Sequence, residues 1–174
     1  MAHYNEMNDP MEGAFLSNLT DRELSSNIWS GKRQLLICCF STDYRHTLLW
    51  SHYADSHQGC CLEVEVTSNL APHEVQYTRY MPVADSGGAI EILSHKSEFW
   101  QYEDEIRFFK NDKNEKGNRT HPYLSVKITK VLLGYRMSSG DVAFYSSLIH
   151  SILGDDIEVR RIEKNELNTG FESV

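Results

Sequence analysis

The chain has 174 residues, of which 25 are acidic and 17 basic, and 40% are apolar, so its formal net charge is -8 at pH 7. This size and composition fit a globular protein with a substantial core and exclude a disordered chain. The excess of acidic residues argues against a protein whose whole surface binds a phosphate backbone. Nucleic acid is a candidate partner, but the net charge does not indicate it. No apolar run could span a bilayer and no signal peptide is recognisable, which predicts a cytoplasmic location and no membrane partner.

The first predicted elements are a turn and a helix. The sequence "NDPMEG" over 8–13 is a turn signal, because the residue before a proline disfavours helix. Thr20 and Glu23 have the spacing of a capping box, which predicts a helix over about 21–30. We expect Gly31 to end this helix.

The next stretch predicts strand, helix and strand. The short apolar run 34–41 predicts a strand covered on both faces and central to its sheet. Residues 44–56 have helical spacing, with Trp50 and Tyr53 on the apolar face. Alternation over 60–66 predicts a half-buried strand.

The rest of the chain continues as short strands and helices. The predicted elements are a strand over 73–77, a helix over 89–100, strands over 102–109 and 123–135, a helix over 140–154 and a strand over 156–162. Helices interleaved irregularly with short strands indicate an α+β protein. We expect a single domain over 1–174, with a mixed, mostly antiparallel sheet and several short helices.

The four cysteines form two adjacent pairs, Cys38-Cys39 and Cys60-Cys61. Neighbours in a strand point to opposite faces, so neither pair has the geometry of a disulfide or of a two-ligand metal clip. We expect small buried apolar side chains here, and no metal.

The first candidate site lies in the segment "WSHYADSH". His52 and Asp55 are three positions apart on one helix face, and an aspartate-oriented histidine is the arrangement of a general base. The alternative is an ordinary surface pair, with His57 as a structural histidine at the helix end. Zinc held by His52 and His57 is disfavoured, because five-residue spacing separates them by about 140° on a helix.

The second candidate site is "WQYEDEIR". A strand would place Glu103, Glu105 and Arg107 on one face, where one carboxyl group could be raised in pKa and the other held ionised by the guanidinium. Trp100 and Tyr102 would supply the aromatic walls typical of small-ligand clefts. The alternative is a solvated sheet face of alternating charges.

Taken together and in order, these motifs resemble an uncharacterised bacterial domain family. Its pattern is an NDP(F/M)E turn, a CFS strand, a WSHYA-D-x-H-x-G-x-C segment, V-x-Y, a lysine, and W-x-Y-E-x-E-x-R. The matching residues are Asn8-Asp9-Pro10 with Glu12, Cys39-Phe40-Ser41, Trp50 through Cys61, Val75 with Tyr77, Lys96, Trp100 through Arg107, and Leu133-Gly134. The match covers nearly the whole chain.

Some members of this family are described as abortive-infection (phage-defence) proteins, so the resemblance implies a bacterial defence role. Family members usually carry a strand-rich stretch ahead of the NDP turn. We therefore expect this chain to lack an N-terminal strand region of the family.

The pattern is also loosely similar, at the level of fold, to ADP-ribosyltransferases. Carried over by position, this resemblance implies Glu105 or Glu103 as the catalytic acid, Ser41 in the cofactor strand and Tyr53 as an aromatic wall. It makes NAD a candidate cofactor.

The leading hypothesis is therefore a defence or toxin-type enzyme acting on a nucleotide-containing substrate. Its expected catalytic residues are Glu105, Glu103, His52 and Asp55, and its expected ligand-binding residues are Tyr53, His57, Lys96, Trp100, Tyr102, Arg107 and Ser41. One alternative is a non-catalytic sensing or interaction module in which the polar motif residues form a buried network that fixes the fold. Another is a metal-free hydrolase acting through the Asp-His pair.

Overall fold

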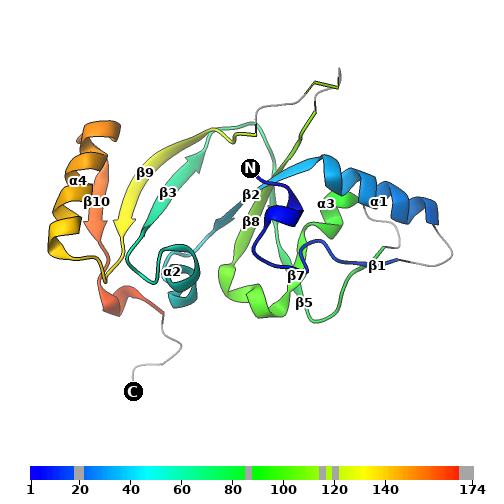
Figure 1. Cartoon of the computed structure of the whole chain (residues 1–174), viewed down its shortest axis with the longest axis horizontal. Helices are drawn as coiled ribbons and strands as arrows, with labels where there is room; N and C mark the ends of the chain where they lie inside the picture. The colour runs from blue at the N-terminus through cyan, green and yellow to red at the C-terminus, as the bar shows by residue number, and fades with distance from the viewer. Residues whose placement is uncertain (18–21, 85–87, 114–116, 119–121, 169–174) are drawn as a thin grey trace. The chain divides into compact units, whose positions relative to one another are not determined.

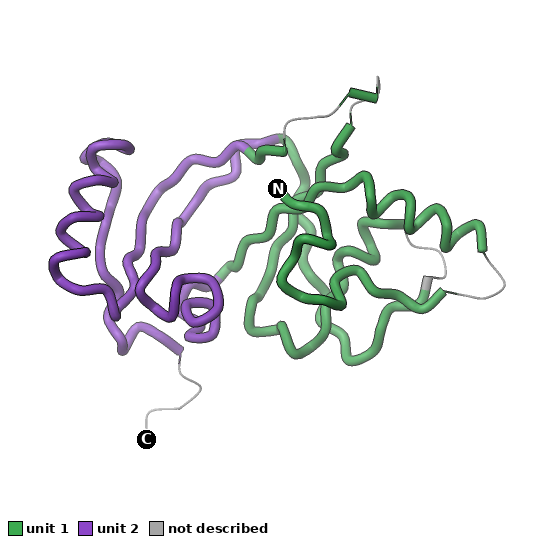
Figure 2. Tube along the Cα trace, viewed as in Figure 1, with its two compact units in different colours: residues 1–42, 69–124 green, residues 43–68, 125–174 purple. Residues whose placement is uncertain are grey.

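The structure is a computed structural model that describes residues 1–17, 22–84, 88–113, 117–118 and 122–168. Its helices and its mixed and antiparallel sheets give the expected α+β class (Figure 1). Contacts group the chain into two compact units (Figure 2): unit 1 is formed by residues 1–42 and 69–124, and unit 2 by 43–68 and 125–174. The expected single domain over 1–174 stays a prediction.

Unit 1 holds the N-terminal turn, two α-helices and seven of the described strands. Its elements are η1 (Tyr4–Glu6), β1 (Leu16–Ser17), α1 (Arg22–Gln34), β2 (Leu35–Ser41), β4 (Pro72–Glu74), β5 (Gln76–Thr78), β6 (Val83–Ala84), α3 (Ala89–Ile92), β7 (His95–Ser97), η2 (Glu98–Glu103) and β8 (Glu105–Asn111). They form an antiparallel sheet of order β2-β8-β4 and two parallel pairs, β1-β6 and β5-β7.

The central strand of the three-stranded sheet is β8, and not β2 as the apolar run 34–41 predicts. β2 pairs with β8 along its whole length, from Leu35 opposite Asn111 to Ser41 opposite Glu105. On its other side the described contact is an isolated bridge between Ile37 and Ala2. The first half of β2 is buried because side chains of the core cover it, so an apolar run reports burial and not position in the sheet.

Helix α1 continues past Gly31 to Gln34. A Cβ atom at residue 31 would come within 2.8 Å of the Ala89 Cβ, so glycine is present for close packing of α1 on α3 and does not end the helix. Ile28 and Ile92 form the buried contact between these helices. The predicted cap at Thr20 lies outside the described residues.

Two further segments differ from the sequence predictions. The predicted helix over 89–100 is helical only to Ile92; it then becomes strand β7 and the 3-10 helix η2. The predicted strand over 73–77 is two strands that separate at Val75, where β4 joins β8 and β5 joins β7. Both segments are short, and tertiary pairing overrides local spacing there.

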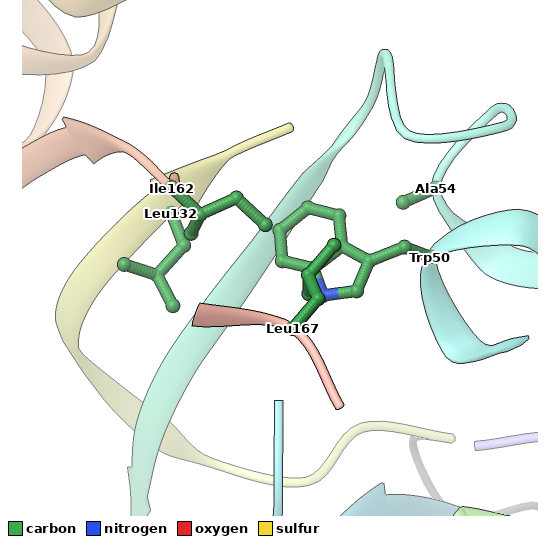
Figure 3. Packing of buried hydrophobic residues seen from close by; sticks show 5 residues of the cluster. All are labelled: Trp50, Ala54, Leu132, Ile162 and Leu167. Atoms are coloured by element: carbon green, nitrogen blue, oxygen red, sulfur yellow. The ribbon is translucent and has the colours of Figure 1, made fainter. Parts of the chain in front are cut away.

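Unit 2 consists of one sheet with a helix on each face. Its elements are α2 (Thr47–Tyr53), β3 (Cys60–Val66), β9 (Val126–Leu133), α4 (Ser139–Leu153), β10 (Glu158–Arg161) and η3 (Lys164–Glu166), and its sheet order is β10-β9-β3. The alternation of β9 sets the layers: Val131 and Leu133 pack in the cluster with α4, and Leu132 packs on the other face with Trp50 of α2. Figure 3 shows the Trp50 indole pointing toward Leu132 and Ile162.

Strand β3 has the predicted bounds but not a regular alternation. Its register to β9 shifts between Glu63 and Val64, so Leu62 is about half exposed while Val64 is partly covered. Cys60 is exposed, which corrects the expectation of burial for that residue, and the other three cysteines are half-buried. All four are free thiols. Among the described residues no helix is long and apolar enough to cross a membrane.

Candidate functional site

Five charged side chains of unit 1 are buried together: Glu12, Lys96, Glu103, Glu105 and Arg107, which we call the charged cluster. They come from four places in the chain. Glu12 lies in the N-terminal turn, which forms as predicted, Lys96 on β7, Glu103 at the end of η2, and the last two on β8. Folding therefore gathers the second candidate site, but inside the protein.

Arg107 lies at the centre of the charged cluster and is fully buried. Its guanidinium binds Glu12 through two hydrogen bonds of 2.6 and 2.8 Å and Glu105 through two of 2.9 and 3.0 Å. The remaining N–H donates to the Leu93 carbonyl oxygen. All five donors of the guanidinium are thus satisfied, which is the condition for burying an arginine.

Lys96 links the remaining carboxylate, Glu103, to Glu105. Its ammonium donates to Glu103 and, at 3.1 Å, to the same Glu105 oxygen that accepts from Arg107. It also lies 4.9 Å from the centre of the Trp100 ring.

The two-residue spacing between Glu103 and Glu105 predicts that both lie on one strand, but Glu103 lies outside β8. It ends the 3-10 helix η2, and Asp104 turns the chain with a positive φ of 43° before β8 begins. Glu105 and Arg107 do share one face of β8, as predicted. Glu103 reaches them through Lys96.

Glu105 forms hydrogen bonds with four groups and accepts from three of them. Besides the two cations, it is bonded by the Cys39 thiol across the β2–β8 pair, and its backbone N–H donates to the Tyr77 hydroxyl at 2.9 Å. Burial acts to raise the pKa of its carboxyl group, but the hydrogen bonds and charge of Arg107, with the charge of Lys96, outweigh burial and lower this pKa. Glu105 is therefore held as a carboxylate.

The pKa values of the groups that contact Glu105 shift accordingly. Burial acts to lower the pKa of Lys96, yet Glu105 and Glu103 raise it above its usual value. Burial raises the pKa of the Cys39 thiol, and Glu105 raises it further. Burial also raises the pKa of Tyr77 to about 12. Each group keeps the protonation state that its bonding requires across the neutral range.

Lys32 is a further buried cation of unit 1, close to the charged cluster. Its ammonium donates to the Gly13 carbonyl oxygen at 2.5 Å and lies 4.0 and 4.4 Å from the ring centres of Trp29 and Tyr4. Burial lowers its pKa to about 8, while the charge of Glu12 acts in the opposite direction. With Lys32 counted, the three acidic residues of the charged cluster are matched by three basic ones, and Asp9 is a further buried acidic residue.

The aromatic residues of the motif border the charged cluster. The rings of Trp100 and Tyr102 lie 6.0 Å apart, and both side chains are half-buried. Burial, followed by the charge of Glu103, raises the pKa of Tyr102. Ser41, at the exposed end of β2, pairs with Glu105 in the register of the sheet.

The first candidate site differs more from its prediction. Helix α2 ends at Tyr53, and Asp55 follows with a positive φ of 45°. Asp55 is therefore off the helical path that would align it with His52, and both are exposed. Tyr53 is also exposed, so its predicted place in the packed face is wrong, whereas Trp50 is buried as expected.

His57 has a structural position at the end of this turn. Its Nε2 lies 3.0 Å from the Ser51 hydroxyl, and its ring packs 4.9 Å from Tyr135. Burial, followed by the charge of Arg136, lowers its pKa. Its backbone carbonyl accepts from Arg136 at 3.1 Å and touches Gly134 so closely that a Cβ there would lie 2.0 Å away. The buried histidine thus fixes the turn to the end of β9.

The two candidate sites lie in different units, His52 and Asp55 in unit 2 and the charged cluster in unit 1. Sequence reasoning missed Lys32 entirely, although its spacing of four from Ile28 puts it on the buried face of α1. It also did not foresee that Glu12 and Glu105 would share Arg107.

The charged cluster is chemically suited to stabilising the fold. Among the described residues, no group of three histidine, cysteine, aspartate or glutamate side chains is placed to hold a metal ion. Comparisons with protein-family models, with curated proteins and with solved structures give no match.

Proposed function

We propose that this protein is a non-catalytic interaction module whose charged motif residues stabilise the fold. The observation that supports this is the burial of the charged cluster: Glu105 and Glu103 are 6% and 5% exposed, and Arg107 is 0% exposed. A carboxylate that acts as a general acid or base must contact its substrate and exchange a proton with it. These carboxylates are instead occupied by Lys96 and Arg107.

The surface for interaction is the outer face of α4. This helix packs through Val142 and Ile149 against the sheet of unit 2. Phe144, Leu148 and Ile152, spaced at four residues, lie on its other side with 62%, 42% and 70% of their surface exposed. Apolar residues at this spacing form a continuous stripe, and exposed stripes of this kind are typical of protein contact sites.

The charges at the ends of α4 define the partner. Asp141 lies in its first turn, and Asp155 and Asp156 follow its last. An apolar stripe with acidic ends complements an amphipathic helix whose flanks are basic. A second copy of this chain fits less well, because antiparallel packing would bring acidic ends together on proteins of net charge -8.

A designed peptide tests this surface. A helical peptide of leucine and lysine, with its leucines on one face, is titrated into the protein by calorimetry. We expect the peptide to bind, and a leucine–glutamate peptide of the same pattern not to bind. Leu148→Glu and Ile152→Glu should each reduce the affinity about tenfold or more. Leu62→Glu, an exposed leucine on β3, is the matched control and should leave it unchanged.

Two outcomes would contradict the assignment. If the control variant loses binding as much as the α4 variants, the peptide is recognised by charge alone. If sedimentation equilibrium finds a dimer that Ile152→Glu dissociates, the stripe serves self-association.

The competing proposal is an ADP-ribosyltransferase-like enzyme of phage defence acting on a nucleotide-containing substrate. Its support is the pair of half-buried rings, Trp100 and Tyr102, next to Glu103 and Lys96. NAD consumption by the wild-type protein and by Glu105→Gln distinguishes the two proposals. Activity that the variant abolishes at unchanged stability favours the enzyme, and no turnover with a loss of stability in the variant favours the module.

A further inference from the structure

A surface hollow of unit 1 lies along α1, apart from the charged cluster, and encloses about 560 Å³. Helix α1 contributes Ser26, Trp29, Ser30, Arg33 and Gln34, and the segment directly after β8 contributes Asp112 and Lys113. This volume suits a ligand of nucleotide size.

The sequence brings these two segments together for a simple reason. Positions 26, 29, 30, 33 and 34 share the outer face of a helix by their three- and four-residue spacing. Strand β2 starts immediately after α1 and pairs with β8, with Leu35 opposite Asn111. The Asp112 N–H then donates to the Gln34 carbonyl oxygen at 2.7 Å, which holds the segment at the end of α1.

Trp29 provides a fixed aromatic surface in the hollow. The buried ammonium of Lys32 lies 4.0 Å from its ring centre, and the Phe15 ring lies 5.4 Å away. The indole is nevertheless 43% exposed. A ring supported from within and open to the hollow is suited to stacking on a planar base.

The charges of the hollow differ from those of the protein as a whole. Arg33 and Lys113 are exposed, and neither forms an ion pair with a residue that the structure describes. Asp112 Oδ1 is buried and has no hydrogen-bond partner among those residues. The hollow thus presents two exposed cations and an aromatic ring on a protein of net charge -8.

We propose that this hollow binds a mononucleotide. The base stacks on Trp29, and the phosphate contacts Arg33 and Lys113. The helix dipole is negative at this end of α1, so phosphate binding depends on both cations together. The overall acidity favours a single nucleotide over a nucleic-acid strand. This site goes beyond the interaction surface on α4.

Calorimetry with defined probes tests the proposal. The four nucleoside monophosphates, their four nucleosides, inorganic phosphate and a deoxyadenosine hexanucleotide are titrated into the full chain. We expect at least one monophosphate to bind, with its nucleoside and phosphate each weaker by about tenfold or more. The double variant Arg33→Gln with Lys113→Gln should lower that affinity about tenfold or more, and Trp29→Leu similarly.

The controls separate the site from general charge effects. Arg22→Gln, at the far end of α1, and Arg79→Gln, in the exposed pair with Glu98, each remove one positive charge outside the hollow and should leave binding unchanged. Trp29→Leu removes a ring that packs on Lys32, whereas the double variant changes exposed side chains alone and decides the question if Trp29→Leu fails to fold.

Three outcomes overturn the proposal. One is the absence of binding by all four monophosphates at about 1 mM. Another is unchanged affinity in the folded double variant. The third is a hexanucleotide affinity more than about tenfold above that of any monophosphate, which would assign the hollow to single strands.

Discussion

Arg107 binds Glu12, a residue 95 positions earlier in the chain, through two hydrogen bonds within the buried charged cluster. This contact ties the N-terminal turn to the central strand β8. The same guanidinium binds Glu105 on its own strand. The stability of unit 1 should therefore depend on this one side chain more than on any exposed ion pair.

Replacing Arg107 should strongly destabilise the protein. Arg107→Met leaves two buried carboxylates without their main partner, so we expect the free energy of unfolding to fall by about 3–5 kcal/mol in urea denaturation. Arg107→Lys should recover little of this loss, because an ammonium cannot form the two bidentate pairs. Arg79→Gln, in an exposed pair, is the control and should cost less than about 1 kcal/mol. A small effect at Arg107 would show that the charged cluster contributes little.

Glu105→Gln should lower stability and change its pH dependence. The pKa of Glu105 is lowered in the folded protein, so its ionised form contributes stability above the pKa of the unfolded chain. That contribution is lost as the pH falls through the folded-state pKa. We expect the variant to lose about 2 kcal/mol at neutral pH and to show a shallower loss of stability on acidification. Parallel acid profiles of the two proteins would contradict this account.

Lys32 should make the protein more stable at alkaline pH. Its pKa falls from 10.5 to about 8 on folding, so the unfolded chain binds more protons between these values and the free energy of unfolding rises with pH there. A shift of this size corresponds to about 3 kcal/mol for this buried group. Urea denaturation of wild type and Lys32→Met from about pH 7 to 10 should show the rise only in the wild type. The difference between the two profiles isolates Lys32 from Tyr77, which titrates higher.

Gly134→Ala should disrupt the end of β9. A Cβ atom there would lie 2.0 Å from the His57 carbonyl oxygen, and backbone cannot move aside as a flexible side chain can. We expect thermal denaturation to show a loss of about 2 kcal/mol or more. Gly140→Ala, within α4, would place its Cβ atom 3.8 Å from the Ser138 Oγ and should instead be neutral or stabilise the helix by up to about 1 kcal/mol. Equal effects at both glycines would show that the close contact is relieved at little cost.

Local sequence patterns predicted the elements whose capping residues or residue spacing lie within the element itself. Helix α4 begins and ends within one residue of its prediction, because a serine caps its start and Gly154 its end. Strand β3 has its predicted bounds, and Glu105 and Arg107 share a strand face as their spacing requires. In each case a short-range rule is sufficient.

Segments whose form depends on distant partners were predicted less well. Residues 89–100 have helical spacing, yet β7 forms there because β5 offers parallel pairing. Helix α2 stops at Tyr53, where His57 turns back against Gly134 and Tyr135. These contacts span long sequence separations, so no window of the sequence contains them.

The sequence by itself determined which charged and aromatic residues form the motifs of this protein, and their order along the chain. Whether those charges face solvent or one another was decided by the tertiary structure. The sequence pattern of Glu103, Glu105 and Arg107 is equally consistent with a catalytic face and with a buried network. What distinguishes the two is the pairing of these residues with Glu12 and Lys96, which belong to other segments of the chain. Desolvation and pairing depend on the three-dimensional structure, which places these three side chains in the interior of unit 1.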